Sequence, residues 1–129
     1  MIFADERVLA AKRAAHEALI AEDPTTITVH RSGQMDDGAG GVMPIDEDLP
    51  PFVGRLLPES STTRTRQTDV GPVEEQAWQL LAPADADISD AAGVNDEFDA
   101  LGKRFRVVRV RPLRWKAQVY GYQVDCVAL

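Results

Sequence analysis

The chain has few of the residues that support metal, redox or catalytic chemistry. Its 129 residues include one cysteine, Cys126, and two histidines, His16 and His30. A single cysteine cannot form an internal disulfide or a zinc cluster. The histidines are not accompanied by a serine or cysteine nucleophile pattern or by a metal triad. We therefore expect neither an enzyme nor a protein that holds a metal or another cofactor.

The sequence also lacks long apolar runs and any Gly-Lys-Ser or Gly-Lys-Thr. No run is long enough for a transmembrane helix, and the first residues lack the pattern of a secretory signal. The missing Gly-Lys-Ser/Thr excludes a P-loop. Hydrophobic residues make up 44% of the chain, as in ordinary globular proteins, and the length suits one domain. We expect a single domain over residues 1–129, made in a cytoplasm.

Acidic and basic side chains are segregated along the chain. The net charge is −7, yet residues 103–116 hold half of the 14 lysines and arginines and no acid. An acidic body argues against a dedicated nucleic-acid binder, whose affinity depends on neutralising phosphates. Strands that carry one sign of charge indicate a surface that meets a partner. The arginines that we assign to an inter-subunit interface are Arg106, Arg109, Arg111 and Arg114.

One helix is predicted, over residues 5–22. It is rich in alanine, Asp5 can cap its start, and Asp23-Pro24 ends it. Its apolar stripe is expected to pack on a sheet, or alternatively to dock into a neighbouring subunit. His16 is expected on the solvent side. The stripe consists of Val8, Ala11, Ala15 and Leu19.

Residues 25–129 predict a small antiparallel β-barrel or sandwich of about six strands. Short runs rich in β-branched and aromatic residues alternate with Gly, Pro and Asp turn signals. The two terminal strands are expected to meet at residues 111–113, where Pro112 interrupts them. Trp78 and Cys126 are expected in the core, and Gly121 is expected to mark a bulge.

Two polar segments, 32–51 and 59–72, are predicted to be long loops. The first combines Gly, Asp and Pro, and its acidic clusters lack the spacing of a calcium-binding EF-hand. The second is either a flexible hairpin tip or a segment that becomes ordered against a partner. It places arginines among hydroxyl residues: Thr62, Thr63, Arg64, Thr65 and Arg66.

A spaced pattern precedes the second-to-last predicted strand and consists of Asp96, Phe98, Gly102, Phe105 and Val107. It follows WQLLAPADADI at 78–88 and is followed by VYGYQVDCVAL at 119–129. In this order the features resemble the head-completion proteins of tailed bacteriophages, also called head-closure, stopper or head-tail connector proteins. Proteins of that family place an N-terminal helix before a small β-barrel.

The resemblance implies a structural virion protein of the neck, assembled in the host cytoplasm. Such proteins form a ring, typically a dodecamer, below the portal or its adaptor, and they offer a docking surface to the tail terminator or tail tube protein. The family also implies a loop that enters the channel and contacts packaged double-stranded DNA. We favour residues 59–72 for this loop, with 32–51 as the competitor. No membrane is implied.

Two other interpretations fit the same sequence. A tail terminator would form a hexameric ring on the tail tube. A small OB-like or SH3-like barrel would instead bind nucleic acid through Arg106, Arg109, Arg111 and Trp115, because arginines interleaved with aromatics suit single strands. The copy number of the ring distinguishes a tail terminator from a neck protein. Oligonucleotide binding that weakens with salt distinguishes a nucleic-acid-binding barrel from a neck protein.

Overall fold

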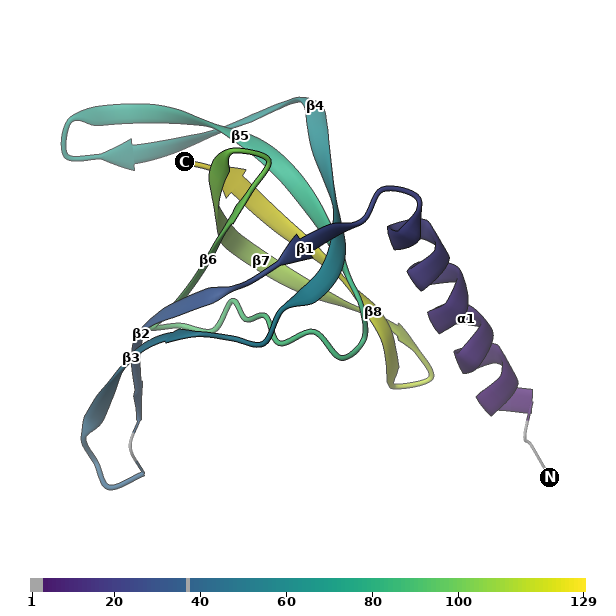
Figure 1. The fold of residues 1–129 in the computed structure, drawn as a ribbon. Helices are drawn as coiled ribbons and strands as arrows, with labels where there is room; N and C mark the ends of the chain where they lie inside the picture. Colours follow the sequence, from purple (N-terminus) through teal and green to yellow (C-terminus); the bar gives the residue numbers. More distant parts are fainter. Residues whose placement is uncertain (1–3, 37) are drawn as a thin grey trace.

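The computed structural model describes residues 4–36 and 38–129, with their side chains except those of 4, 60–68 and 73–75. Within these residues, one helix is followed by an eight-stranded antiparallel sheet that is strongly curled (Figure 1). The predicted class, a small and mainly β barrel with one N-terminal helix, is confirmed.

The helix, α1, spans Ala4–Ala21, within one residue of the predicted range. The strands are arranged in the order β1-β4-β5-β8-β7-β6-β2-β3. Their bounds are β1 Thr25–Ile27, β2 His30–Asp36, β3 Val42–Asp48, β4 Phe52–Thr68, β5 Gly71–Ala82, β6 Val94–Ala100, β7 Lys103–Trp115 and β8 Gln118–Ala128.

The two ends of the sheet meet at a single stretch of chain. β1 pairs with β4 at one end of the strand order, and β2 pairs with β6 near the other end. Only Thr28 and Val29 separate β1 from β2, and β1 also lies against β6. The sheet therefore curls until its inner face surrounds one core.

Aromatic side chains on the inner face form the centre of that core. The rings of Phe98 and Phe105 stack with their centroids 5.2 Å apart, and Trp78 meets Phe105 edge-on at 5.3 Å. Cys126 is fully buried in the same cluster. Such burial is the main favourable contribution to folding. The predictions that Trp78 anchors the core and that Cys126 lies on the inner side of the last strand are confirmed.

The segments predicted as long loops are β-hairpins instead. β2 pairs with β3 along its whole length, and β4 pairs with β5 as far as the turn at 69–70. Both hairpins extend beyond the barrel (Figure 1). The prediction of a long loop is wrong for 32–51, whereas for 59–72 the alternative of a hairpin agrees with the structure. Main-chain pairing needs no apolar alternation where both faces of a hairpin lie outside a core.

The turn between the last two strands is also displaced from its predicted position. It lies at Lys116-Ala117, where both residues have positive φ, 48° and 68°. Pro112 lies inside β7, opposite Tyr122, so the predicted junction at 111–113 is wrong. Proline is tolerated there because β6 pairs only with residues 103–106, and no described strand pairs with that edge of β7 at Pro112.

The helix packs against β8 and β4 through an unexpected residue. His16 is 6% exposed, and its ring nitrogen Nε2 lies 2.8 Å from the carbonyl oxygen of Ala82. The ring occupies the space over Gly121, which has no Cβ. The prediction of a solvent-facing His16 is therefore wrong. The bulge predicted around Gly121 is confirmed, because the β7–β8 register skips Tyr120.

The apolar stripe that was predicted to pack on the sheet is largely uncovered. The packed side of α1 contains His16 and Ile20, which are buried, and the half-buried Leu9. Val8 and Leu19 are 36% and 43% exposed. The sequence identified an amphipathic helix correctly but assigned the wrong side of it to the barrel.

Candidate assembly surfaces

β7 directs a row of side chains to the outside of the barrel. Arg109, Arg111 and Leu113 alternate on this side, while Val110 packs against the core. The row is set by a bulge at Val108, which has no partner in β8. A bulge of this kind shifts the alternation of a strand by one residue. We call the row the β7 outer face.

Arg111 is committed to an ion pair inside its own chain. Its NH2 group donates to Oδ2 of Asp125 at 2.7 Å. The Asp125 side chain is only 3% exposed, whereas that of Arg111 is 46% exposed. A buried carboxylate is costly unless a cation compensates it. Arg111 therefore has a structural role that its sequence context did not indicate.

A second charge cluster joins β7 to β6. Arg104 donates to Glu97 and to Asp99, both at 3.0 Å. Burial opposes the charged form of Glu97, but hydrogen bonds from Arg104 and Asn95 outweigh it and lower the pKa of Glu97. The hydrogen bond to Glu97 raises the pKa of Arg104. The charge of Arg106 also favours ionised Glu97.

Two of the four predicted interface arginines are available to a partner. Arg109 and Arg114 are both exposed. Among the side chains that the structure describes, neither forms an ion pair or a side-chain hydrogen bond. Arg106 and Arg111 already interact within the subunit. The free positive charge is thus concentrated on Arg109, at the middle of β7, and on Arg114, near its end.

The predicted channel residues lie in the β4 arm of the β4–β5 hairpin. The backbone pairs Thr63 with Gln76, after a register shift that begins at Pro58. β8 pairs with β5 only from Gln76 onward, so the distal part of the hairpin is a two-stranded ribbon in the described structure. The side chains of residues 62–66 lie outside the described part of the molecule.

The β2–β3 hairpin carries an acidic group around one histidine. His30 Nε2 lies 2.6 Å from Asp46 Oδ1, and its Nδ1 lies 2.8 Å from Asp48 Oδ1. The hydrogen bond with Asp48 is the main reason that the pKa of His30 is raised, and burial opposes the rise only in part. The two carboxylates thus favour the protonated form of His30, and its charge is lost only as pH rises above its ordinary pKa of 6.5.

A buried ion pair fixes the connector between β5 and β6. Arg31 donates from Nε and NH2 to the two carboxylate oxygens of Asp96, at 2.8 and 2.9 Å. The Asp96 side chain is fully buried and also accepts a 2.7 Å hydrogen bond from the backbone nitrogen of Ser89. The hydrogen bonds to Asp96 raise the pKa of Arg31 above its ordinary value. In the sequence, Asp96 was noted only as part of the family pattern, and nothing there indicated that it is buried beside Arg31.

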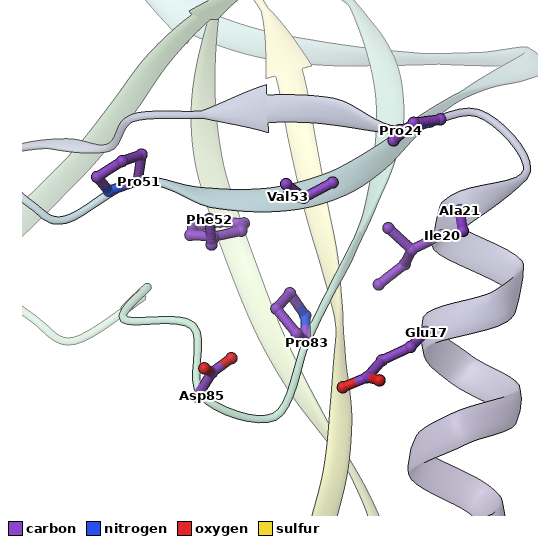
Figure 2. Close-up of a pocket in the computed structure, with 9 residues that line it drawn as sticks. All are labelled: Glu17, Ile20, Ala21, Pro24, Pro51, Phe52, Val53, Pro83 and Asp85. Carbon is purple, nitrogen blue, oxygen red and sulfur yellow. The ribbon is translucent and has the colours of Figure 1, made fainter.

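Of the recesses that border α1 in the described structure, two are lined mainly by apolar residues. The first, the α1–β4 groove, has a volume of about 440 Å³ and opens between the helix, β4 and the connector after β5 (Figure 2). Two acids, Glu17 and Asp85, stand on its lower side in that view. Its apolar lining is Ile20, Ala21, Pro24, Pro51, Phe52, Val53 and Pro83.

The second groove, the α1–β7 groove, lies on the other side of the helix and has a volume of about 320 Å³. The uncovered apolar stripe of α1 contributes Ala15 and Leu19 to it. Lys12 Nζ lies 5.5 Å from the centroid of the Tyr120 ring, so a cation stands at this groove. The lining residues are Lys12, Ala15, His16, Leu19, Leu113 and Tyr120.

The described residues contain neither a candidate metal cluster nor a membrane-spanning helix. No group of three or more His, Cys, Asp or Glu side chains there is arranged to hold a metal ion. The helix of this part of the chain is not apolar enough to cross a membrane.

Comparison with known protein families and with curated proteins finds no match to this sequence. Among solved structures, the chain is similar to one from the "Virion of native gene transfer agent (GTA) particle", with a TM-score of 0.46 and 15% sequence identity. The similarity covers 81% of this chain and 90% of the other. At that identity and TM-score, the likeness does not assign a function.

Proposed function

We propose that this chain is a structural protein of a phage-like virion. More narrowly, it is a subunit of the head-to-tail connector ring, which closes the DNA-filled head below the portal or adaptor and receives the tail. A ring protein needs surfaces for its neighbours and an element that reaches the channel. The proposal gives these tasks to the β7 outer face and to the β4–β5 hairpin.

The observation that supports the proposal best is the projecting β4–β5 hairpin. It continues beyond the last residue of β5 that pairs with β8, so its distal part is not needed to complete the barrel. Arg64 and Arg66 lie in this part, among threonines. Arginines contact DNA phosphates through charge and hydrogen bonds without reading the sequence. A ring would bring many such hairpins together around one axis.

The exposed arginines support the second part of the proposal. A closed ring uses heterologous contacts, in which one patch of a subunit meets a different patch of the next. Arg109 and Arg114 have no partner among the described residues, while the remainder of the chain is acidic. Complementary charges of this kind direct association and fix its orientation.

The direct test is to examine particles. The protein should be present in purified virions, and cryo-electron microscopy should place it in the neck as a ring. Particles made without it should contain filled or leaking heads that lack tails. A protein that is absent from particles, or whose loss leaves particles infectious, would overturn the proposal. Twelve copies per ring support a connector, and six copies support a tail terminator.

Shortening the hairpin tests the channel assignment separately. Residues 62–75 are replaced by a short Asn-Gly turn, which suits a two-residue hairpin connection. The variant should fold and enter particles, but the packaged DNA should become accessible to nuclease. The matched control shortens the β2–β3 hairpin across residues 36–42. If only the control exposes the DNA, the β2–β3 hairpin is the channel element.

The nucleic-acid alternative is tested by binding assays with the purified protein. A neck protein should bind short single-stranded or duplex DNA weakly. Strong binding that falls steeply with salt, and that is lost in Arg109→Ala, would instead favour a nucleic-acid-binding barrel.

A further inference from the structure

The outer part of the β2–β3 hairpin has an apolar side that nothing in the described chain covers. Met35 and Met43 lie directly opposite each other in the register, so their side chains share one side of the hairpin. They are 49% and 51% exposed. Ile45 follows Met43 on the same side and is half-buried. Flexible methionines adapt well to the surface of a partner.

One exposed acid lies on this apolar side, and its cross-strand neighbour Arg31 is already paired with Asp96 and Asp87. Glu47 lies two positions after Ile45, on the same side of β3, and is exposed. Asp46 and Asp48 project from the opposite side, toward His30. Residues 34–48 contain no lysine or arginine. An occupant that buries the methionines should therefore be apolar in the middle and basic beside it.

Of the two mainly apolar grooves described above, only the α1–β7 groove also contains a cation. The α1–β4 groove is bordered by the acids Glu17 and Asp85, which would repel the hairpin (Figure 2). The α1–β7 groove instead contains Lys12. One of its lining residues, Leu113, belongs to the β7 outer face, on which Arg109 also lies. Charge thus selects the α1–β7 groove.

The spacing of the residues on the two surfaces also agrees. Met43 and Glu47 are four residues apart on one side of β3, and Leu113 and Arg109 are four residues apart on the β7 outer face. Four residues of extended strand span about 13 Å. When β3 lies antiparallel to β7 with Met43 over Leu113, Glu47 therefore reaches Arg109.

The hairpin cannot reach the groove of its own chain. The β2–β3 hairpin projects from one side of the barrel, whereas α1 and the β7–β8 turn lie on the opposite side (Figure 1). The occupant is therefore a second copy. A projection and a recess on opposite sides of one molecule make a heterologous contact, which can close into a ring.

We propose that the β2–β3 hairpin of one copy docks in the α1–β7 groove of the next, with Met35 and Met43 buried against the helix stripe and Leu113. This contact rests on the proposed ring and names its interface. It uses the uncovered stripe of α1 and the unpaired Arg109, neither of which the barrel itself requires.

Disulfide trapping tests the contact and its polarity. Two single variants, Met35→Cys and Ala15→Cys, are mixed under oxidising conditions. The mixture should give a heterodimer, whereas neither variant alone should form dimers. Val53→Cys, in the α1–β4 groove, is the matched control and should not trap with Met35→Cys. Because Cys126 is fully buried, it stays in place. Equal trapping with Val53→Cys, or none with Ala15→Cys, overturns the proposal.

A charge exchange provides the second test. Glu47→Arg and Arg109→Glu should each weaken self-association about tenfold in sedimentation or native mass spectrometry, since each places like charges together. The double variant should regain most of the affinity. Arg114→Glu is the control on the same strand and should not be rescued by Glu47→Arg. Losses that add in the double variant would contradict the pairing.

The two proposals fail in different ways. If the protein is found in the neck but Met35→Cys and Ala15→Cys do not trap in intact particles, the docking is wrong and the proposed function stands. If the pair traps in purified protein but the protein is absent from particles, the docking stands and the proposed function is wrong.

Discussion

Replacing Gly121 with alanine should destabilise the chain through its effect on a single side chain. A Cβ at this position would lie 2.3 Å from Cδ2 and 2.4 Å from Nε2 of His16. Real contacts of that kind are not tolerated, so the imidazole must move. Movement breaks its hydrogen bond to the carbonyl of Ala82, which is 2.8 Å long and buried.

The cost can be worked out from these contacts. Overpacking costs about 1–3 kcal/mol, and an unsatisfied buried polar group costs about 1–3 kcal/mol. Because partial relaxation of α1 relieves some of each, we expect Gly121→Ala to lower the free energy of unfolding by about 2–3 kcal/mol. His16→Ala removes the ring and should cost about 2 kcal/mol. Once the ring is absent, Gly121→Ala should cost less than about 0.5 kcal/mol.

Urea unfolding of the wild type, both single variants and the double variant measures this coupling. The expected interaction energy is about 2 kcal/mol, with the double variant more stable than the sum of the single effects predicts. The comparison needs no assumption about assembly, because it concerns a contact within the subunit. Additive costs, within about 0.5 kcal/mol, would show that the His16 ring is not seated over Gly121.

Three further predictions concern buried or paired groups. Asp96→Ala should destabilise by about 3–5 kcal/mol in urea, because it leaves the largely buried Arg31 with only the exposed Asp87 as a partner and removes the acceptor of the Ser89 N–H; a cost below about 1 kcal/mol would contradict the buried pair. The raised pKa of His30 means that its stabilising effect is complete below its ordinary value of 6.5 and is lost as pH rises through the higher folded-state value. The advantage of the wild type over His30→Gln should therefore shrink across neutral pH, and an advantage that grows would refute the pairing. Burial raises the pKa of Cys126 to about 12, so thiol reagents at pH 8 should label it only after unfolding, and rapid labelling of the folded protein would contradict that.

The barrel itself could be predicted because its core leaves a local pattern. Phe98 and Phe105 lie on predicted strands at positions that alternate with charge, and both are fully buried. Trp78 was placed correctly for the same reason, although its segment also favours a helix by composition. Alternation with period two survives wherever one side of a strand faces a core and the other faces outward.

The hairpins could not be predicted in the same way. Outside the barrel, neither side of β3 or of the distal β4 faces the core, so selection for a core imposes no alternation there. Pairing is then visible only in main-chain hydrogen bonds, which any residue except proline can donate. Residues 32–51 and 59–72 accordingly look like loops in composition and fold as strands in the chain.

Long-range pairs were hidden for a different reason. The burial of His16 depends on Gly121, and the burial of Asp125 depends on Arg111. Arg111 lies two residues beyond Arg109, the residue that pairs directly with Asp125 in the sheet. No local pattern reports a contact between residues so far apart, or the register that creates it. Leaving a buried polar side chain without a partner is energetically costly, so a partner must exist. The sequence does not show which residue that partner is.

The β7 outer face shows how one local irregularity connects the core with the proposed assembly surface. Strict alternation from Phe105 would continue through Val107 to Arg109 and would direct that arginine into the core. Val108 has no partner in β8, so the phase shifts and Val110 takes the inner position instead. Charged and apolar residues alternate along this stretch of β7 except at Val107 and Val108, which are adjacent. This interruption of the alternation is the sequence signal of the shift. The same bulge that keeps the core apolar therefore places Arg109 outside, where a neighbouring subunit can reach it.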